Sequence, residues 1–395
     1  MVINWSLTGR GPKPGGSFPE SPPSTEEKGM NRYKSILAAS VLALGASTFA
    51  AVAQERVVNV YNWSDYIDED ILGEFTAATG IKVVYDVFDS NEVLETKLLA
   101  GSTGYDVVVP SGTFLSRQIQ AGVFMKLDKS KLPNLANMWD AIAERTAKYD
   151  PGNDYSINYM WGTTGIGYNV DKVKEALGDD APVDSWDLVF KPENMEKLAA
   201  CGVHFLDAPV ELIPAALNYI GEDPDSKDPD VIAKAESVLM AVRPYIQKFH
   251  SSEYINALAN GDICLAVGWS GDVLQARDRA AEADNGVEIA YSIPSEGALM
   301  WFDQMAIPAD AQNVDEALAF LDYIMRPDVI AKASNYVAYA NGNKASQEVM
   351  DKEVLEDPAV YPTAEATSRL YTKLAYDPKT QRVATRLWTK VTTGQ

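Results

Sequence analysis

Residues 57 to 63, VVNVYNW, form an apolar, β-branched run that predicts a buried strand ending in a polar, aromatic segment. Helical spacing follows at 68–78, and IKVVYDVF at 81–88 predicts a second strand. We expect Asn91 to cap the next helix, and YDVVVP at 105–110 to form a third strand. Strands that alternate with helices pair in parallel through right-handed crossovers, and near-continuous apolar strands indicate a sheet covered on both faces. The sequence therefore predicts an α/β fold.

The middle of the chain continues this alternation. YMWGTTGIGYNV at 159–170 predicts two short strands around a glycine-rich turn. Further strands are expected at 203–208, 262–269 and 300–306, and a helix at 209–219. The α/β pattern therefore extends over most of the chain after its first 56 residues.

The loops after the predicted strands carry a recurring set of side chains. Ligands of open parallel sheets bind in the crevice beyond the carboxyl ends of the strands. The acidic, aromatic and hydroxyl residues in those loops are Trp63, Asp65, Tyr66, Ser111, Glu211, Trp269 and Asp272. Carboxylates pair with ammonium groups, and aromatic faces attract cations and cover methylene groups. The set predicts a site for an organic cation, although each side chain taken singly also fits core packing or a solvated surface.

Sequence signatures of enzymes are missing. The chain has no GxSxG, no HExxH, no phosphate-binding glycine loop and no dinucleotide fingerprint. His204 and His250 stand alone and are interpreted as structural. We therefore predict no catalytic residue, no cofactor, no metal site and no enzymatic activity. A carboxylate pair that hydrolyses glycosides is the alternative that the residues leave open.

Charge and cysteine content restrict the partners and the compartment. The chain has 34 Lys and Arg against 56 Asp and Glu, a net charge of −22. Such a surface repels nucleic acid and anionic lipid and favours cationic partners, or serves solubility alone. The two cysteines, Cys201 and Cys264, fit one disulfide in an oxidising compartment or two buried thiols.

Residues 30–53 have the features of a secretory signal. Arg32 and Lys34 give a basic start, a short apolar run follows, and small residues at 51–53 suit signal peptidase. We predict a cleaved signal peptide and an exported soluble protein, with an N-terminal membrane anchor as the alternative. Residues 1–29 are rich in Gly, Pro and Ser and are expected to be a disordered extension or a mis-assigned start.

Eight segments of the chain closely resemble one family, the periplasmic polyamine-binding proteins, which are the putrescine and spermidine receptors of bacterial ABC importers. The putrescine type is the most similar. The segments cover the chain in order from residue 60 to residue 345: VYNWSDYI (60–67), GIKVVYDVFDSNEVLE (80–95), AGSTGYDVVVPS (100–111), GIGYNVDKV (165–173), NGDICLAVGWSGD (260–272), MWFDQMAIP (300–308), RPDVIA (326–331) and YANGNKA (339–345).

The resemblance implies a periplasmic binding protein-like (type II) fold with two lobes and a ligand cleft between them. Lobe 1 is expected to contain 54–158 plus about 278–325, and lobe 2 to contain 159–277 plus about 326–395. It further implies a monomeric periplasmic receptor that captures a polyamine, with putrescine as the first candidate and spermidine as the second, and delivers it to the permease of an ABC importer in the inner membrane. A polyamine-sensing protein for signalling is the alternative.

Site residues are carried over from the resemblance by position. Trp63, Ser64, Asp65 and Tyr66 are expected to form one wall of the cleft, with Ser111 beside them. From the other lobe come Glu211, Asp272 and the stacking ring of Trp269. Asp303 is the expected main amine anchor, and Tyr339 closes the pocket. Trp301 stands where the putrescine type often carries Phe, which leaves selectivity open. Cys201 and Cys264 match a cysteine pair of the family, which implies a disulfide between them.

Overall fold

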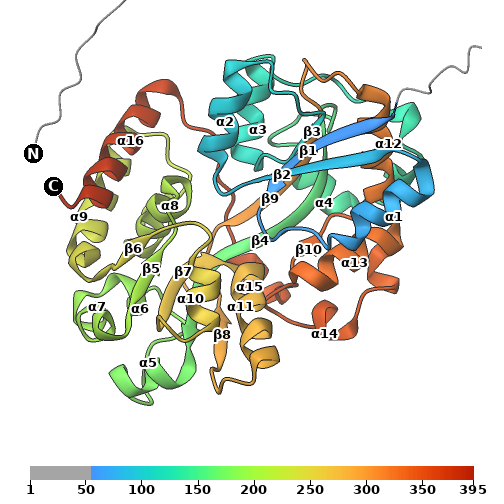
Figure 1. The fold of residues 1–395 in the computed structure, drawn as a ribbon. Coiled ribbons are helices and arrows are strands. Elements are labelled where there is room, and N and C mark those ends of the chain that lie inside the picture. Colours follow the sequence, from blue (N-terminus) through green and yellow to red (C-terminus); the bar gives the residue numbers. More distant parts are fainter. Residues whose placement is uncertain (1–54) are drawn as a thin grey trace, which may run out of the picture. The chain divides into compact units, whose positions relative to one another are not determined.

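The computed structural model describes residues 55–395, and Figure 1 shows their fold. The predicted signal peptide at 30–53 and the extension at 1–29 lie outside the described residues. Within the described range, no helix combines the length and the apolar character needed to cross a membrane.

Ten strands of the described residues form one mixed sheet. Their order is β2-β1-β3-β9-β4-β7-β5-β6, and both β8 and β10 pair with β4. The strands are β1 (Val57–Trp63), β2 (Lys82–Phe88), β3 (Val107–Val108), β4 (Ser156–Asn169), β5 (Val203–Phe205), β6 (Lys248–Phe249), β7 (Leu265–Trp269), β8 (Ile289–Ser292), β9 (Met300–Ala306) and β10 (Ala340–Asn341).

Helices occupy most of the connections between these strands. The α-helices are α1 (Asp70–Thr79), α2 (Asn91–Ala100), α3 (Gly112–Gln120), α4 (Asp140–Thr146), α5 (Val170–Leu177), α6 (Asp187–Phe190), α7 (Pro192–Leu198), α8 (Pro209–Tyr219), α9 (Pro229–Val242), α10 (Tyr254–Ala259), α11 (Ser270–Ala283), α12 (Val314–Ile324), α13 (Pro327–Val337), α14 (Lys352–Leu355), α15 (Ala364–Ser368) and α16 (Pro378–Thr393). Short 3-10 helices lie at η1 (Lys129–Lys131), η2 (Pro133–Asn137), η3 (Ala199–Cys201), η4 (Arg243–Tyr245) and η5 (Ala345–Glu348).

A group of three parallel strands stands toward each end of the sheet. β1 pairs in parallel with β2 and β3, and β5 pairs in parallel with β6 and β7. The antiparallel strands β9 and β4 join the two groups. The predicted parallel pairing is confirmed within each group. The carboxyl ends of both groups therefore supply loops that can face one another.

Strand β4 is the main correction to the sequence-based elements. The expected pair of short strands at 159–170 is one continuous strand of 14 residues. Its glycines do not turn the chain but allow close packing. A Cβ atom at Gly162 would lie 2.7 Å from the Trp301 ring, and one at Gly167 would lie 2.5 Å from Val273. The first part of β4 pairs with β9 and the last part with β7, so this strand carries the chain from one group to the other.

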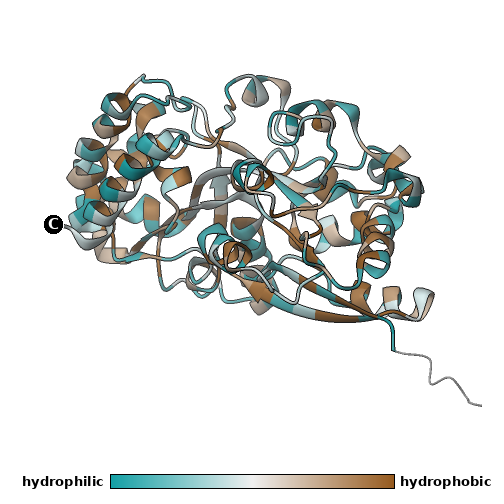
Figure 2. Cartoon of the chain, turned by 90° about the horizontal axis from the view of Figure 1, so that it is seen from above, coloured by the Kyte–Doolittle hydropathy of each residue, from teal (hydrophilic) through white to brown (hydrophobic). Residues whose placement is uncertain are grey.

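Each group of parallel strands has its own hydrophobic core. Val58, Val60 and Phe320 belong to the first core, whereas Phe205 and Leu265 belong to the second. In Figure 2 several helices carry hydrophobic and hydrophilic residues on different sides, as expected of helices that cover a sheet. We call the parts around these cores the first lobe and the second lobe, in agreement with the expected two-lobed fold.

The segments that make up each lobe remain a proposal. Leu387 and Val391 of α16 pack in the second core. In contrast, Val329 and Val337 of α13 pack in the first core. We therefore propose that the expected lobe boundaries be kept, except that α13 is assigned to the first lobe. The end of α11 and β8, whose Ile289 packs in the second core, are assigned to the second lobe.

Two local expectations have different outcomes. Asn91 was expected to cap α2, but the cap is Ser90, whose Oγ accepts a hydrogen bond from the backbone N–H of Val93. Asn91 faces Ser111 instead. The disulfide between Cys201 and Cys264 is confirmed, and it ties η3 to the residue before β7.

Candidate functional site

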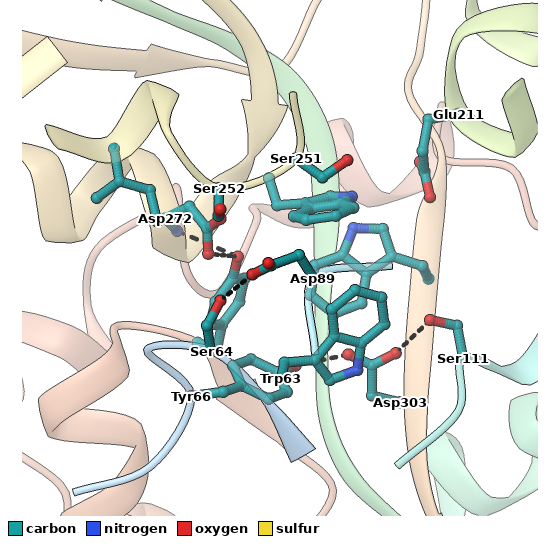
Figure 3. A pocket seen from close by; sticks show the side chains of 14 residues that line it. Trp63, Ser64, Tyr66, Asp89, Ser111, Glu211, Ser251, Ser252, Asp272 and Asp303 are labelled. Carbon is teal, nitrogen blue, oxygen red and sulfur yellow. Dashed lines mark hydrogen bonds between the residues drawn. The ribbon is translucent and has the colours of Figure 1, made fainter. Parts of the chain in front are cut away.

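Residues of both lobes line a pocket of about 470 Å³, shown in Figure 3. Ten of the eleven predicted ligand-binding residues line it: Trp63, Ser64, Tyr66, Ser111, Glu211, Trp269, Asp272, Trp301, Asp303 and Tyr339. The sequence did not point to four further lining residues, Asp89, Ser251, Ser252 and Ile255. The predicted residues therefore meet at one place, and their contact with a ligand stays a prediction.

Asp303 lies in the middle of β9 and is 4% exposed. Its Oδ1 accepts a hydrogen bond from Ser111 Oγ at 2.6 Å, and its Oδ2 accepts one from Tyr66 Oη at 2.8 Å. Asn91 holds Ser111, because Asn91 Oδ1 accepts from the Ser111 N–H and Asn91 Nδ2 donates to Ser111 Oγ. Burial raises the pKa of Asp303 to about 7 in spite of its two hydrogen bonds, and the nearby Asp272 adds to the rise.

Asp272 lies in the first turn of α11, where a helix N-terminus favours negative charge. Its Oδ1 accepts a hydrogen bond from Tyr339 Oη at 2.6 Å, and its Oδ2 accepts one from Tyr254 Oη at 2.7 Å. Gly271 leaves the space for Tyr339, since a Cβ atom there would lie 2.4 Å from the tyrosine ring. Burial raises the pKa of Asp272 to about 6, and the two tyrosine hydrogen bonds limit the rise.

Glu211 supplies a third buried carboxylate, from the first turn of α8. Pro209 starts that helix, because a proline at the first helical position needs no hydrogen-bond partner for a backbone N–H. Glu211 Oε2 accepts a hydrogen bond from Thr164 Oγ1 at the point where β4 passes into the second lobe. Burial raises the pKa of Glu211 to about 7, and Asp303 contributes to the rise.

Within residues 55–395, none of these three carboxylates forms an ion pair with Lys, Arg or His. Buried carboxylates without a cationic partner are costly when they ionise, which is why their pKa values are raised. An organic cation would supply the missing charge. The arrangement therefore favours a ligand with more than one ammonium group.

Aromatic rings form the apolar part of the pocket. The ring centroids of Trp63 and Trp269 are 5.6 Å apart, and Tyr339 lies 5.3 Å from Trp301 and 5.2 Å from Tyr66. Trp63 is fixed by its indole N–H, which donates to the carbonyl of Val109 at 2.9 Å. Such rings cover methylene groups and attract cations through their faces, by about 0.5–2 kcal/mol each.

Asp65 is the predicted residue that the structure places outside the pocket lining. Its backbone turns through a left-handed conformation with φ 52°, and its Oδ1 lies 2.7 Å from Arg279 Nη2 on α11. The physical reason is the turn, which places the carboxylate beside a cation of the second lobe. We interpret the Asp65–Arg279 pair as a link between the lobes.

We expect Arg279→Gln to weaken ligand binding by up to about fivefold, because a partly exposed ion pair contributes at most about 1 kcal/mol. Asp65→Asn should have the same effect, and the double variant should be no weaker than either single variant. Calorimetric titration of the three variants checks this. Wild-type affinity in both single variants would show that this link between the lobes does not contribute to ligand binding.

Several residues that hold the carboxylates in place could not be identified from the sequence. Tyr254 on α10 and Thr164 on β4 donate to Asp272 and Glu211, and Asn91 supports Ser111. Thr164 lies within β4, and Tyr254 and Asn91 are the first residues of α10 and α2, so none of them belongs to the loops at strand ends that the sequence singled out. Only the tertiary packing brings them to the pocket, so no local pattern could identify them.

Comparisons with known proteins show which sequences and which fold this chain is similar to. Residues 70–363 match the sequence profile of the family described as "Bacterial extracellular solute-binding protein". The chain is 56% identical over 361 residues to the putrescine-binding periplasmic protein PotF of Escherichia coli strain K12, covering 91% of this chain and 97% of PotF. It is 54% identical over 366 residues to the putrescine-binding periplasmic protein SpuD of Pseudomonas aeruginosa, covering 93% of this chain and 100% of SpuD.

A solved structure is also similar. It is a putative spermidine/putrescine ABC transporter protein from Listeria monocytogenes, with a TM-score of 0.76 and 30% sequence identity. The match covers 86% of this chain and 100% of that one. The similarity therefore extends over nearly all of the described fold.

Proposed function

We propose a ligand and a role for this chain from the premise that it belongs to the family of bacterial extracellular solute-binding proteins. The chain captures a linear polyamine in the pocket between its lobes and delivers it to the permease of an ABC importer. Putrescine is the first candidate ligand, and spermidine is the second.

One observation carries this proposal. Three buried carboxylates, those of Glu211, Asp272 and Asp303, share an aromatic pocket that contains no Lys or Arg side chain. Two ammonium groups of a diamine would neutralise carboxylates of the pocket, and the rings would cover the methylene groups between them. The names of PotF and SpuD, both putrescine-binding, support the same ligand class.

The role in transport follows from the same family. We propose a periplasmic location, export through a cleaved signal peptide at residues 30–53, and a monomeric receptor without a nucleic-acid partner. A ligand held by both lobes would bind the closed form more tightly than the open form. It would shift the equilibrium toward the closed form by this difference in affinity. The permease would then recognise the closed, loaded receptor.

A thermal-shift assay tests the proposed ligand class. Putrescine and spermidine should raise the unfolding temperature, because a ligand that binds only the folded state stabilises it. Sulfate, maltose and glutamate should leave it unchanged. If no polyamine raises the unfolding temperature, the proposed ligand class is wrong.

Trp301 is expected to affect the choice between ligands. The indole is 8% exposed, its N–H has no hydrogen-bond partner among the described residues, and it lies two residues before Asp303 on β9. We expect Trp301→Phe to change the ratio of putrescine to spermidine affinity by about threefold or more, because the smaller ring alters the space beside the amine anchor. Calorimetry with both ligands measures the ratio, and an unchanged ratio would remove Trp301 from selectivity.

A further inference from the structure

A second, larger groove opens beside the pocket and shares two of its lining residues. The groove has a volume of about 890 Å³. Glu92 at the start of α2 lines one side, and Trp388 of α16 lines the other. Figure 1 shows these two helices in the upper part of the molecule. Asp89 and Ser251 line both the groove and the pocket, so the two spaces are continuous at these residues.

The groove carries mainly negative charge, and its one basic lining residue, His250, lies 3.3 Å from Glu253. Asp89, Glu92 and Asp207 line it, and none of these carboxylates forms an ion pair with Lys or Arg within the part of the chain that the structure describes. By contrast, Glu95, one turn further along α2, pairs with Arg117. Glu92 is also close enough to the pocket for its charge to raise the pKa of Glu211.

A buried hydroxyl gives a second, independent indication of a polar ligand. Ser251 is only 7% exposed, and its Oγ has no hydrogen-bond partner among the described residues. An unpaired buried polar group costs about 1–3 kcal/mol, so such groups normally have a partner. Ser251 lies in the wall where the groove meets the pocket, and Figure 3 shows it beside that space.

The groove also has an apolar wall. The ring centroids of Phe249 and Trp388 lie 5.5 Å apart in an edge-to-face arrangement. The Trp388 indole N–H donates to Asp207 Oδ1 at 2.7 Å, which fixes both groups at the groove. Acids beside aromatic rings repeat the chemistry of the pocket at its outer side.

We infer that this groove is a second cation subsite, which holds the projecting ammonium group of a triamine or tetraamine whose other end lies in the pocket. This inference rests on the proposed function. The methylene chain would pass Asp89, the Ser251 hydroxyl would accept a hydrogen bond from an amine N–H, and Glu92 and Asp207 would hold the outer ammonium group. A diamine that fits within the pocket would not reach them.

The test compares short and long polyamines on one variant. Glu92→Gln/Asp207→Asn removes two charges without changing side-chain shape, and neither residue lines the pocket. Calorimetric titration at low salt should show spermidine and spermine affinities about five- to tenfold lower, since exposed charge pairs contribute modestly. Putrescine affinity should stay within about twofold. Glu92→Gln alone should show part of the loss while leaving the Trp388–Asp207 hydrogen bond in place.

A matched control removes two charges elsewhere. Glu282→Gln/Glu353→Gln changes exposed acids at the end of α11 and in α14. If spermine loses no more affinity in the groove variant than in this control, the inference is wrong. An equal loss of putrescine affinity would also overturn it, because the groove would then attract every cation by its negative charge and would not bind the end of a long polyamine. If the wild-type protein binds no polyamine at all, the proposed function itself fails.

Discussion

Asp303→Asn should weaken putrescine binding by about 30- to 1,000-fold, which corresponds to about 2–4 kcal/mol. The substitution removes the charge that pairs with an ammonium group and leaves that group without a partner in a desolvated pocket. The amide also fits the site poorly, because Ser111 and Tyr66 both donate hydrogen bonds to the carboxylate and an amide nitrogen cannot accept one. Calorimetric titration of the variant measures the loss.

Stability of the empty protein separates a binding effect from misfolding. The substitution loses one hydrogen-bond acceptor but also removes a buried carboxylate that has no cationic partner among the described residues, so the unfolding temperature should stay close to that of the wild type. Asp180→Asn, at an exposed site in the loop after α5, is the matched control and should bind as wild type. Binding by Asp303→Asn within threefold of wild type would remove Asp303 as the amine anchor.

Putrescine binding should release protons, and its affinity should fall at least tenfold between pH 8 and pH 5.5. The pKa of Asp303 and of Glu211 is raised to about 7 and that of Asp272 to about 6, so the empty pocket holds protons near neutral pH. A dication favours the ionised carboxylates and displaces roughly one proton at pH 7, while its own amines stay charged over this range. Titration in buffers of different ionisation enthalpy measures the released protons.

The same pKa values set the sign of a stability change in the empty protein. Because the folded pKa values are raised, the folded state binds more protons than the unfolded state between about pH 4 and pH 7. The free energy of unfolding should therefore lose a contribution as the pH rises through that window. Asp303→Asn should reduce both this slope and the proton release. A pH-independent affinity in the wild type would contradict the assignment of these carboxylates to the ligand.

Much of the fold follows from local sequence pattern. The apolar run of β1, the parallel pairing of its neighbours and the span of α8 could be predicted because each depends on residues close in the chain. β4 could not. Its glycines resemble a turn in sequence, but they serve to let Trp301 and Val273 approach the backbone, which only the packed structure shows.

The residues of the candidate site also fall into those that could be predicted from the sequence and those that could not. Residues at strand ends, such as Trp63 and Ser111, could be predicted from the rule that ligands of open sheets bind beyond the carboxyl ends of the strands. Asp303 and Tyr339 were predicted from the family resemblance. Tyr254 could not be predicted, because it reaches Asp272 from the first residue of α10, 18 residues earlier in the chain and outside the loops at strand ends. Asp65 shows the converse, since it stands in the right loop but its left-handed backbone turns it to Arg279.

Calorimetric titration of the protein with putrescine, spermidine and maltose, repeated with Asp303→Asn, tests the central claim most directly. The account predicts saturable binding of both polyamines at one site per chain, no heat of binding with maltose, and a loss of at least 30-fold for putrescine in the variant. Binding of maltose, or polyamine binding that the variant leaves intact, would contradict the claim that this pocket holds a linear polyamine through its buried carboxylates.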